Sequence, residues 1–499
     1  MKILKKIALR FIIFLGLLIG LNIFYIFFFL ENDLQKHSPI INQVRAVPQD
    51  TEVLYIGESS NNTAASIDID KRAISDFLAD HYPSLNFADI TKPASHSGIY
   101  KTLLRHLEHA PKIKTVIVTL NMRSFNAEWI NSGLEIPLRK SMLLLQNRPP
   151  LFNRFMLSFK GYPITTEKER WKRIKKDWME SKLHLPHPFT YPTTFDWRTH
   201  IEEAGVNDEN GIRNEKLTNL VRDYVSTYAF ELDLKTNPRI KDFNAIIKLA
   251  KKNNWNLVFN LLAENIEKAE LLGGKPLSYL MRENRDKLVH YFTDKGVTVV
   301  DNLEALPDEQ FIDKDWPTEH YFEMGRKIIG KNVANAIQKF HPEAYSPKNY
   351  QIIFQSHFHN DCEGETTWSR METTTDEQAF SGKFSSKTDA ENEFSLSFEF
   401  PFTNIPDSTK NSIEISMMLK AEVIEETVAF VVDIRGEKIE RYWASCSLKP
   451  MALETNGWQR IHHLFILPDR VLDGEIISIY LLNSSGEPIY VDDIDILFQ

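Results

Sequence analysis

The sequence predicts an α/β domain with a parallel sheet, followed by an all-β sandwich and preceded by one transmembrane helix. Three patterns in the 499 residues lead to this fold class. A long apolar run stands near the N-terminus, short apolar runs alternate with helical stretches from 52 to 340, and apolar and polar residues alternate after Pro347. Because domains cluster near about 100 to 200 residues, we expect two or three folded units.

The N-terminal residues predict a membrane anchor. Residues 11–30 read FIIFLGLLIGLNIFYIFFFL, which as a helix is long enough for the roughly 30 Å hydrocarbon core of a bilayer. Basic residues precede this run and acidic residues follow it, so the positive-inside rule puts the N-terminus in the cytoplasm. The run is too long for a cleaved signal peptide and lacks a small-residue cleavage site. We therefore expect residues 1–30 to be a cytoplasmic stub and signal anchor of a single-pass inner-membrane protein whose bulk is periplasmic or extracellular.

Composition excludes several classes of protein. Lys and Arg total 59 and Asp and Glu total 68, so a net charge of −9 offers no polycationic surface to a nucleic acid. The 42% hydrophobic and 25% charged residues exclude general disorder. Cys362 and Cys446 are too few for a disulfide framework or a four-thiolate metal site, and whether they pair with each other stays open.

Residues 31–50 carry neither helical nor alternating periodicity and are expected to be a linker to the α/β domain, 51–345. Continuous Val, Ile and Leu runs separated by helices are typical of a parallel sheet covered on both faces, with functional sites at the carboxyl ends of the strands. We expect strands at 52–57, 85–90, 113–121, 255–262 and 297–303, and helices at 70–81, 97–109, 238–253, 276–294 and 321–339.

An insertion, 126–236, separates the third and fourth expected strands and is too long for a plain loop. We expect it to form a cap with structure of its own. It contains four tryptophans and the basic, helix-like stretch EKERWKRIKKDWMESK at 167–182. Two interpretations stay open: a rim that meets a sugar or an anionic polymer, and a solvated helix whose tryptophans are buried against the domain.

After Pro347 the pattern becomes that of antiparallel strands in a β-sandwich. Together with the closing strand YVDDIDILF, residues 346–499 resemble the jelly-roll sandwiches found as carbohydrate-binding modules. Trp368, Trp443 and Trp458 are candidates for a sugar-stacking platform, with core packing as the alternative for each. The alternating segments are 392–402, 411–423, 427–434, 459–468, 475–483 and 490–498.

Acidic residues near both ends of this sandwich are candidate ligands of a structural calcium ion. Asp361 and Glu363 stand near its first strand, and Asp492 and Asp493 lie in its last. Carboxylate oxygens are the ligands that Ca²⁺ prefers, so an ion here would join the two strands. No catalytic metal and no other cofactor is expected.

Two expected strands of the α/β domain end in residues suited to acyl transfer. The first runs into GESS (57–60), which puts the Ser59 hydroxyl on a turn where the following backbone N–H groups can stabilise an oxyanion. A helix-capping role is the alternative for this serine. The third strand ends at Asn121, whose side-chain amide can donate to the same oxyanion.

A histidine with nearby acids stands late in the domain. His320 lies just before the last expected helix, and Asp313, Asp315 and Glu319 flank it. A serine nucleophile needs such a base, and the base needs a carboxylate that fixes its tautomer. The residues therefore complete a candidate triad.

A G-x-S turn, a small-residue turn, an Asn and an acid-plus-His segment follow the block order of the SGNH/GDSL hydrolase family. Residues 50–341 resemble a divergent member, closest to the membrane-anchored branches that add or remove acyl groups on envelope polysaccharides. The resemblance implies a flavodoxin-like, three-layer α/β/α fold. It also implies a nucleophile, Ser59, a general base, His320, an acid, Asp315, and oxyanion donors, Asn121 and the backbone N–H of Gly98 or, in a shifted alignment, Ala94.

The sequence departs from the family pattern at three places. The usual G-D-S is G-E-S here, and the G-x-N-D block is reduced to TLNMR, which keeps Asn121 alone. The acid normally stands three residues before the histidine, where this chain has Pro317. This leaves Asp315, Asp313 and Glu319 as candidates for the acid.

Together these features predict a serine esterase or O-acetyltransferase that acts on a cell-envelope or extracellular polysaccharide. A membrane-embedded acyl-donor protein is a further candidate partner. The alternative is a catalytically degenerate, polysaccharide-binding scaffold, which Pro317 in place of the acid favours. A serine, an Asn and a histidine at three separate block positions favour the enzyme.

Overall fold

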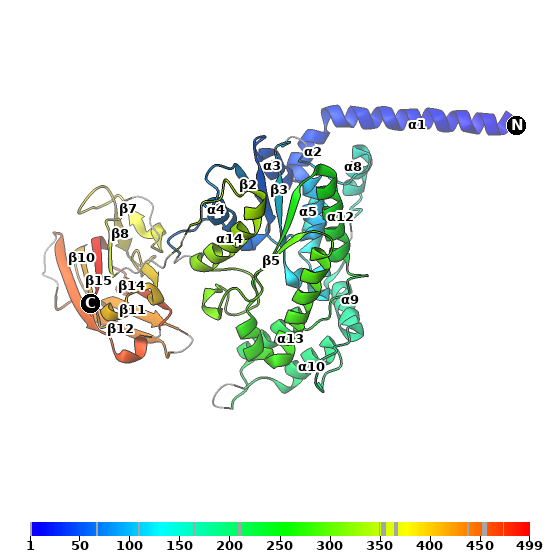
Figure 1. Cartoon of the computed structure of the whole chain (residues 1–499). Coiled ribbons are helices and arrows are strands. Elements are labelled where there is room, and N and C mark those ends of the chain that lie inside the picture. Colours follow the sequence, from blue (N-terminus) through cyan, green and yellow to red (C-terminus); the bar gives the residue numbers. More distant parts are fainter. Residues whose placement is uncertain are drawn as a thin grey trace. The chain divides into compact units, whose positions relative to one another are not determined.

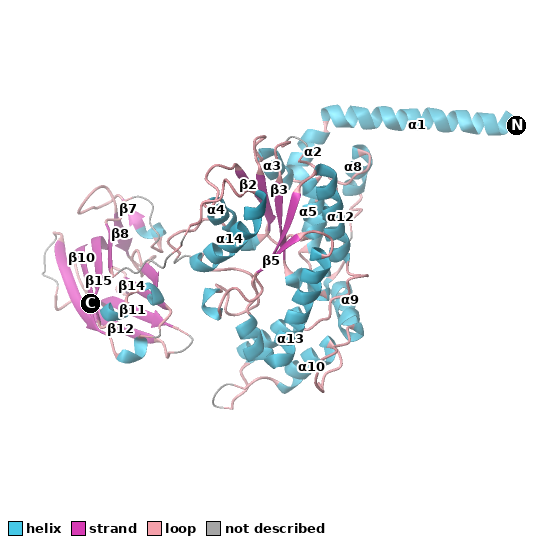
Figure 2. Ribbon diagram, viewed as in Figure 1, coloured by secondary structure: helices cyan, strands magenta, loops and turns pink. Residues whose placement is uncertain are grey.

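The computed structural model describes residues 2–499 except 66–67, 108–109, 163–164, 208–210, 349, 351–355, 364–367, 437–438, 452–456 and 473 (Figure 1). The chain divides into two compact units. The first comprises the residues up to Thr63 with Arg72–Lys348, and the second Ala64–Lys71 with Asn349–Gln499. The first unit mixes helices and strands, whereas the second consists mainly of strands (Figure 2).

The chain begins with a long apolar helix, α1 (Lys2–Phe28). Its stretch Lys6–Phe28 has a mean hydropathy of 2.6 and is only 6% buried. By length and composition this helix is able to cross a membrane, as the sequence predicts.

Residues 31–50 are not the linker that the sequence predicts. Most of this range forms α2 (Leu30–His37) and α3 (Ile40–Ala46), and α3 is packed into the core of the first unit. The buried residues Ile40, Ile41, Val44 and Val47 follow the i, i+1, i+4, i+7 spacing of one helix face. The two helices have 8 and 7 residues. Both are shorter than the window of about 11–18 residues in which helical periodicity is read.

A parallel five-stranded sheet with the order β2-β1-β3-β4-β5 forms the centre of the first unit. This is the flavodoxin-like order of doubly wound sheets, which reverses between β1 and β3 and places ligands beyond the carboxyl ends of those strands. The predicted parallel sheet is therefore confirmed. Its strands are β1 (Val53–Gly57), β2 (Phe87–Thr91), β3 (Thr115–Leu120), β4 (Asn256–Leu261) and β5 (Thr298–Asp301).

Helices cover both faces of this sheet. Leu54 and Ile56 of β1 pack into one core with α5, α12 and α13, whereas Val53 and Tyr55 pack into a second core with α4 and α14. Successive strand residues point to opposite faces, so a fully buried strand needs cover on both sides. The helices are α4 (Ile74–Ala79), α5 (Ser97–Leu104), α12 (Pro238–Asn253), α13 (Ile266–Thr293) and α14 (Glu323–Ile337).

The insertion between β3 and α12 is helical. Trp178 and Trp197 are buried, whereas Trp171 is 43% exposed and lies under the Arg198 guanidinium. Packing therefore accounts for two of the tryptophans, while the basic residues of α9 face solvent. The helices are α6 (Ala127–Ile130), α7 (Glu135–Ser141), α8 (Pro150–Ser158), α9 (Glu167–Glu180), α10 (Thr194–Ala204) and α11 (Glu215–Tyr228).

The second unit is the predicted antiparallel β-sandwich. One sheet has the order β13-β10-β15-β8-β7, with β6 also paired to β15, and the other has the order β12-β11-β14-β9. Alternate residues of both sheets, such as Phe430 and Ile496, form the core. The strands are β6 (His357–Asn360), β7 (Thr374–Thr375), β8 (Ser385–Thr388), β9 (Phe398–Pro401), β10 (Ser412–Ala421), β11 (Val428–Arg435), β12 (Tyr442–Ser447), β13 (Gln459–Ile466), β14 (Ile476–Asn483) and β15 (Ile489–Phe498).

Aromatic and sulfur side chains of the sandwich occupy different environments. Trp368 belongs to the core, Trp458 packs edge-on against Phe380, and Trp443 is 49% exposed on β12. Cys362 and Cys446 are both free thiols, and burial raises the pKa of Cys362 to about 12.

The four carboxylates suggested for calcium accept hydrogen bonds from backbone N–H groups or from a serine hydroxyl. Asp492 accepts hydrogen bonds from the N–H groups of Phe380 and Ser381 at 2.8 and 3.1 Å, and Glu363 accepts one from Phe384 at 2.6 Å. Asp493 accepts a hydrogen bond from the Ser381 hydroxyl, and Asp361 from the N–H of Glu363. Among the described residues no group of three or more His, Cys, Asp or Glu side chains is arranged to hold a metal ion.

Candidate active site

Ser59 lies where β1 leaves the sheet. The strand ends at Gly57, and the short 3-10 helix η1 (Ser59–Asn61) begins at the serine. A Cβ on Gly57 would lie 2.8 Å from Oγ1 of Thr119, so a side chain does not fit between β1 and β3 here. The glycine therefore lets the turn form directly at the carboxyl end of β1, next to the reversal in strand order.

Ser59 contacts His320, which is 261 residues further along the chain. Oγ of Ser59 lies 3.0 Å from Nε2 of His320, and Nδ1 of the same ring lies 2.7 Å from Oδ2 of Asp313. The His320 side chain is 18% exposed, so the group is accessible from solvent. A carboxylate at Nδ1 favours the tautomer that leaves Nε2 free to accept a proton, which is the arrangement of a serine-nucleophile triad.

The acid that the resemblance implies, Asp315, is not the carboxylate beside His320. It is 65% exposed and forms an ion pair with Lys216 at 2.7 Å. The third candidate, Glu319, is fully buried and forms an ion pair with Arg123. Asp313 occupies the position beside His320 instead.

A small antiparallel hairpin explains why Asp313, and not Asp315, lies beside His320. Phe311 and Tyr321 form an isolated bridge, and the N–H of Ile312 donates to the carbonyl of His320 at 3.0 Å. The turn of the hairpin returns the chain so that Asp313, seven residues before His320, comes beside the ring. Counting residues along the chain favours nearer acids, because it does not take this pairing into account.

The predicted oxyanion donors differ in their availability. Asn121 follows β3, and its Oδ1 accepts a hydrogen bond from the N–H of Ser124 at 3.3 Å. Its side-chain amide is directed to the Glu319 carboxyl, which lowers the pKa of that group, so an oxyanion would share this donor with Glu319. The N–H of Gly98 donates to Nδ1 of His96 at 3.1 Å, so the proposed oxyanion role of Gly98 is not supported. Ala94, the alternative, lies in the loop before α5 with a φ of 56°.

A buried cluster of charged residues adjoins the triad in sequence and in space. Glu58 precedes Ser59, and its Oε2 lies 3.4 Å from the Ser59 hydroxyl. Arg123 places Nη2 2.6 Å from Oε2 of Glu319, and its Nη1 donates to the carbonyl of Pro317 at 2.9 Å. Arg123 thereby fixes the segment that carries His320.

Two buried acids of this region, Glu319 and Glu264, hold protons more tightly than exposed acids do. Burial raises the pKa of Glu319 to about 7, although the Arg123 charge opposes the rise. Burial and the nearby Glu319 raise the pKa of Glu264 well above its usual range. Oε2 of Glu264 accepts a hydrogen bond from the Tyr228 hydroxyl at 2.6 Å.

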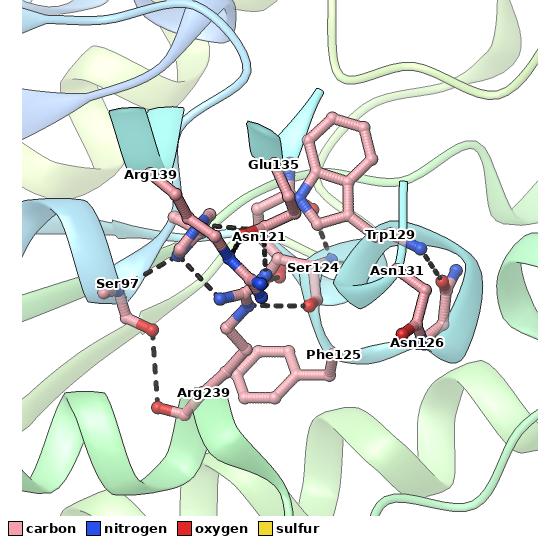
Figure 3. A network of polar contacts seen from close by, with 12 residues as sticks. Ser97, Asn121, Ser124, Phe125, Asn126, Trp129, Asn131, Glu135, Arg139 and Arg239 are labelled. Carbon is pink, nitrogen blue, oxygen red and sulfur yellow. Dashed lines mark hydrogen bonds and ion pairs between the residues drawn. The ribbon is translucent and has the colours of Figure 1, made fainter. Parts of the chain in front are cut away.

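A second polar network holds the loops behind Asn121 (Figure 3). Arg239 of α12 donates to the carbonyl of Ser124 at 3.2 Å and forms a buried ion pair with Glu135. Nε2 of His96 lies 2.8 Å from Oε1 of Glu135. Burial acts to raise the pKa of Glu135, but His96 and Arg239 hold it at about 2. The network joins the starts of α5, α7 and α12 to the segment after β3.

Sequence reasoning underestimated several residues of this region. From the sequence, Arg123 stands two residues after Asn121 and is explained about as well by a surface ion pair, and Glu264 follows the fourth expected strand, whereas both side chains are buried in the structure. Their position after buried strands was the available signal. The burial of Glu58 and Glu319 carried no signal of its own in the sequence.

Comparisons with known proteins find distant likenesses in structure. No family model and no curated protein matches the chain. A putative acylhydrolase from Bacteroides fragilis is similar over 60% of this chain and 94% of its own, with 10% identity and a TM-score of 0.27. A xylan-binding domain, CBM22-1 of Paenibacillus barcinonensis Xyn10C, is similar over 28% of this chain and 92% of its own, with 18% identity and a TM-score of 0.21. Likenesses this distant carry no argument for function.

Proposed function

We propose that this protein is a membrane-anchored serine esterase or O-acyltransferase that acts on an extracytoplasmic polysaccharide. The observation that carries the proposal is the unbroken contact from Ser59 through His320 to Asp313, with distances of 3.0 and 2.7 Å. Both lie within the range of about 2.6–3.2 Å in which a base takes a proton from a nucleophile and is itself oriented.

In the first step Oγ of Ser59 attacks the ester carbonyl while Nε2 of His320 takes the hydroxyl proton. The serine–carbonyl bond forms, the bond to the leaving alcohol breaks, and the imidazolium returns its proton to that alcohol. Asp313 stabilises the imidazolium between these events. Water or a sugar hydroxyl then gives a proton to His320 and attacks the acyl carbon. The bond from that carbon to Oγ of Ser59 breaks, and His320 returns its proton to Oγ.

The oxyanion formed in both steps needs donors near the carbonyl. The Asn121 side-chain amide and the backbone N–H of Ser59 or Ala94 are the candidates. Asn121 and Ser59 follow the two strands that flank the reversal in strand order, which supports a common site for them.

The non-catalytic alternative loses its main support. It relied on Pro317 standing where an acid is usual, but Asp313 contacts His320 from another position in the chain. A buried cluster beside the triad, with Arg123 holding the Pro317 carbonyl, is further support for a maintained site.

In this function the β-sandwich binds the polysaccharide. Trp443 lies 49% exposed opposite Asp433 on the neighbouring strand, and Arg441 donates to both oxygens of Asp433 at 2.8 and 2.7 Å. An exposed indole beside fixed polar groups is suited to a sugar, which has an apolar face and hydroxyl edges. Because both units belong to one chain, binding here raises the effective concentration of the polymer at the triad.

The test uses the full-length protein in detergent with p-nitrophenyl acetate. Ser59→Ala should reduce turnover to background and abolish the acyl-serine adduct seen by mass spectrometry. Ser60→Ala is the matched control, because it removes the adjacent, fully buried hydroxyl, and it should keep activity. Equal turnover in the wild type and Ser59→Ala, with no adduct on Ser59, would contradict the proposal.

A second readout separates hydrolysis from transfer. Each turnover releases one p-nitrophenol, whereas acetate appears only when water is the acceptor. If a sugar hydroxyl is the natural acceptor, added oligosaccharide should lower the ratio of acetate to p-nitrophenol, and Trp443→Ala should weaken that effect.

A further inference from the structure

We infer that α8 is a second membrane contact, which lies in the outer surface of the bilayer beside α1. The inference rests on the proposed anchoring of the chain by α1. It concerns a surface with no part in the chemistry at Ser59.

One face of α8 is buried and the opposite face is aromatic. Asn153 and Leu157 face the core of the first unit. Phe152, Phe155 and Phe159 are 47%, 57% and 72% exposed. Their spacing of three and four residues places them in one stripe along the helix, with the rings of Phe155 and Phe159 4.5 Å apart. Exposing three phenylalanine rings on one helix face to water costs free energy, whereas contact with a lipid surface is favourable for them.

The contacts of α8 with α1 indicate what covers this stripe. The N–H of Leu151, at the start of α8, donates to Oδ1 of Asn22 in α1 at 2.9 Å. Oδ2 of Asp33 in α2 accepts hydrogen bonds from the Tyr25 hydroxyl at 2.9 Å and from Nε of Arg154 at 2.7 Å. Figure 1 shows α8 beside the end of α1 that leads into α2. The helix is thus held at the end of the membrane-spanning segment.

The depth of this attachment suits an interfacial helix. Asn22 stands six residues before Phe28, the end of the apolar stretch. At about 1.5 Å per residue this is about 9 Å below the outer end of the span. Amphipathic helices that lie in a membrane surface bury their apolar face by about 5–10 Å. A bilayer crossed by α1 therefore reaches the level of α8.

The charge around α8 fits the same partner. Between Glu135 and Glu167 the chain has no acidic residue. It has five basic residues there, of which Arg139 and Arg154 pair with Glu135 and Asp33, while Lys140, Arg148 and Lys160 complete the set. Basic residues beside an aromatic stripe are the composition of helices that bind surfaces with anionic lipid headgroups. The occupant of the stripe is accordingly the bilayer that α1 crosses.

The experiment measures depth with an environment-sensitive fluorophore on single cysteines. Phe155→Cys is labelled in the full-length protein carrying Cys362→Ala and Cys446→Ser, and reconstituted in vesicles of phosphatidylethanolamine and phosphatidylglycerol. Lipids with a nitroxide high on the acyl chain should quench this label and its emission should shift to the blue. Leu271→Cys is the matched control, because Leu271 is 76% exposed in the same unit and should stay unquenched.

Ile13→Cys, within the apolar stretch Lys6–Phe28, separates this inference from the anchoring on which it rests. Quenching of the Ile13 and Phe155 labels, with none at Leu271, supports the contact. Quenching at Ile13 with a Phe155 label that behaves like Leu271 overturns the contact and leaves the anchor intact. An unquenched Ile13 label overturns both.

Discussion

Replacing Glu319 by Gln should remove a pH dependence from the stability of the first unit. The carboxyl is fully buried, and its pKa is about 7 instead of the usual 4.5. Between these values the folded state keeps a proton that the unfolded state releases, so the free energy of unfolding falls as pH rises. The stability that the protonated Glu319 carboxyl contributes is complete below the pKa of the unfolded state and is lost above the pKa of the folded state. The difference, 7 − 4.5, at about 1.36 kcal/mol per unit, gives about 3 kcal/mol.

Hydrogen exchange of β3 and β4 in the full-length protein is the assay, because these buried strands report the opening of this unit alone. With rates corrected for the intrinsic effect of pH, protection in the wild type should fall between about pH 4.5 and pH 7. In Glu319→Gln the fall should be smaller by at least about 3 kcal/mol, because loss of the Glu319 charge also removes one of the causes that raise the pKa of Glu264. Glu203→Gln, on the exposed surface, should behave like the wild type. An unchanged fall in Glu319→Gln would refute the reasoning.

Three further predictions follow from contacts described above. Asp313→Asn should lower kcat for p-nitrophenyl acetate by roughly 10⁴-fold because it destabilises the required His320 tautomer, whereas Asp315→Asn, exposed and paired with Lys216, should change it less than about twofold. Trp443→Ala should weaken polysaccharide binding in affinity electrophoresis by about tenfold. Trp368→Ala should instead lower the sandwich's free energy of unfolding by about 3–5 kcal/mol. Ile41→Ala should cost the first unit about 2–5 kcal/mol in denaturant unfolding, and no loss would mean that α3 is a mere tether.

The fold was readable because burial on both faces of a parallel sheet leaves continuous apolar runs. The run VIVTL within β3 and the pattern of α12 predicted elements close to those observed, since each is long or uniformly apolar enough to fix its type. The sequence did not predict α2 and α3, because helices this short show barely two turns of periodicity. The predicted helix at 276–294 is the second part of α13, whose path breaks at Gly274 with a φ of 71°.

The candidate site was predictable where strand ends bring residues together, and less so where a loop does. Ser59 follows β1 and Asn121 follows β3, so the topology alone brings them to one edge. Asp313 and Asp315 stand two positions apart in one loop. The bridge between Phe311 and Tyr321 decides which of them reaches His320. The N–H of Gly98 donates to His96, and this contact depends on the orientation of one side chain, which residue spacing does not reveal.

The helical insertion between β3 and β4 affects the order in which the first unit folds. Thr115 pairs with Asn256 across 141 positions of chain, so the sheet remains open along one side of β3 until the helical insertion has been synthesised. An unpaired strand edge of this kind is prone to associate with other chains, and pairing so distant in sequence is slow. His320 follows later still, so the proposed nucleophile, Ser59, meets its base only when the unit is almost complete. During synthesis the first unit is therefore expected to pass through an association-prone intermediate, and rapid folding of α6 to α11 would shorten its lifetime.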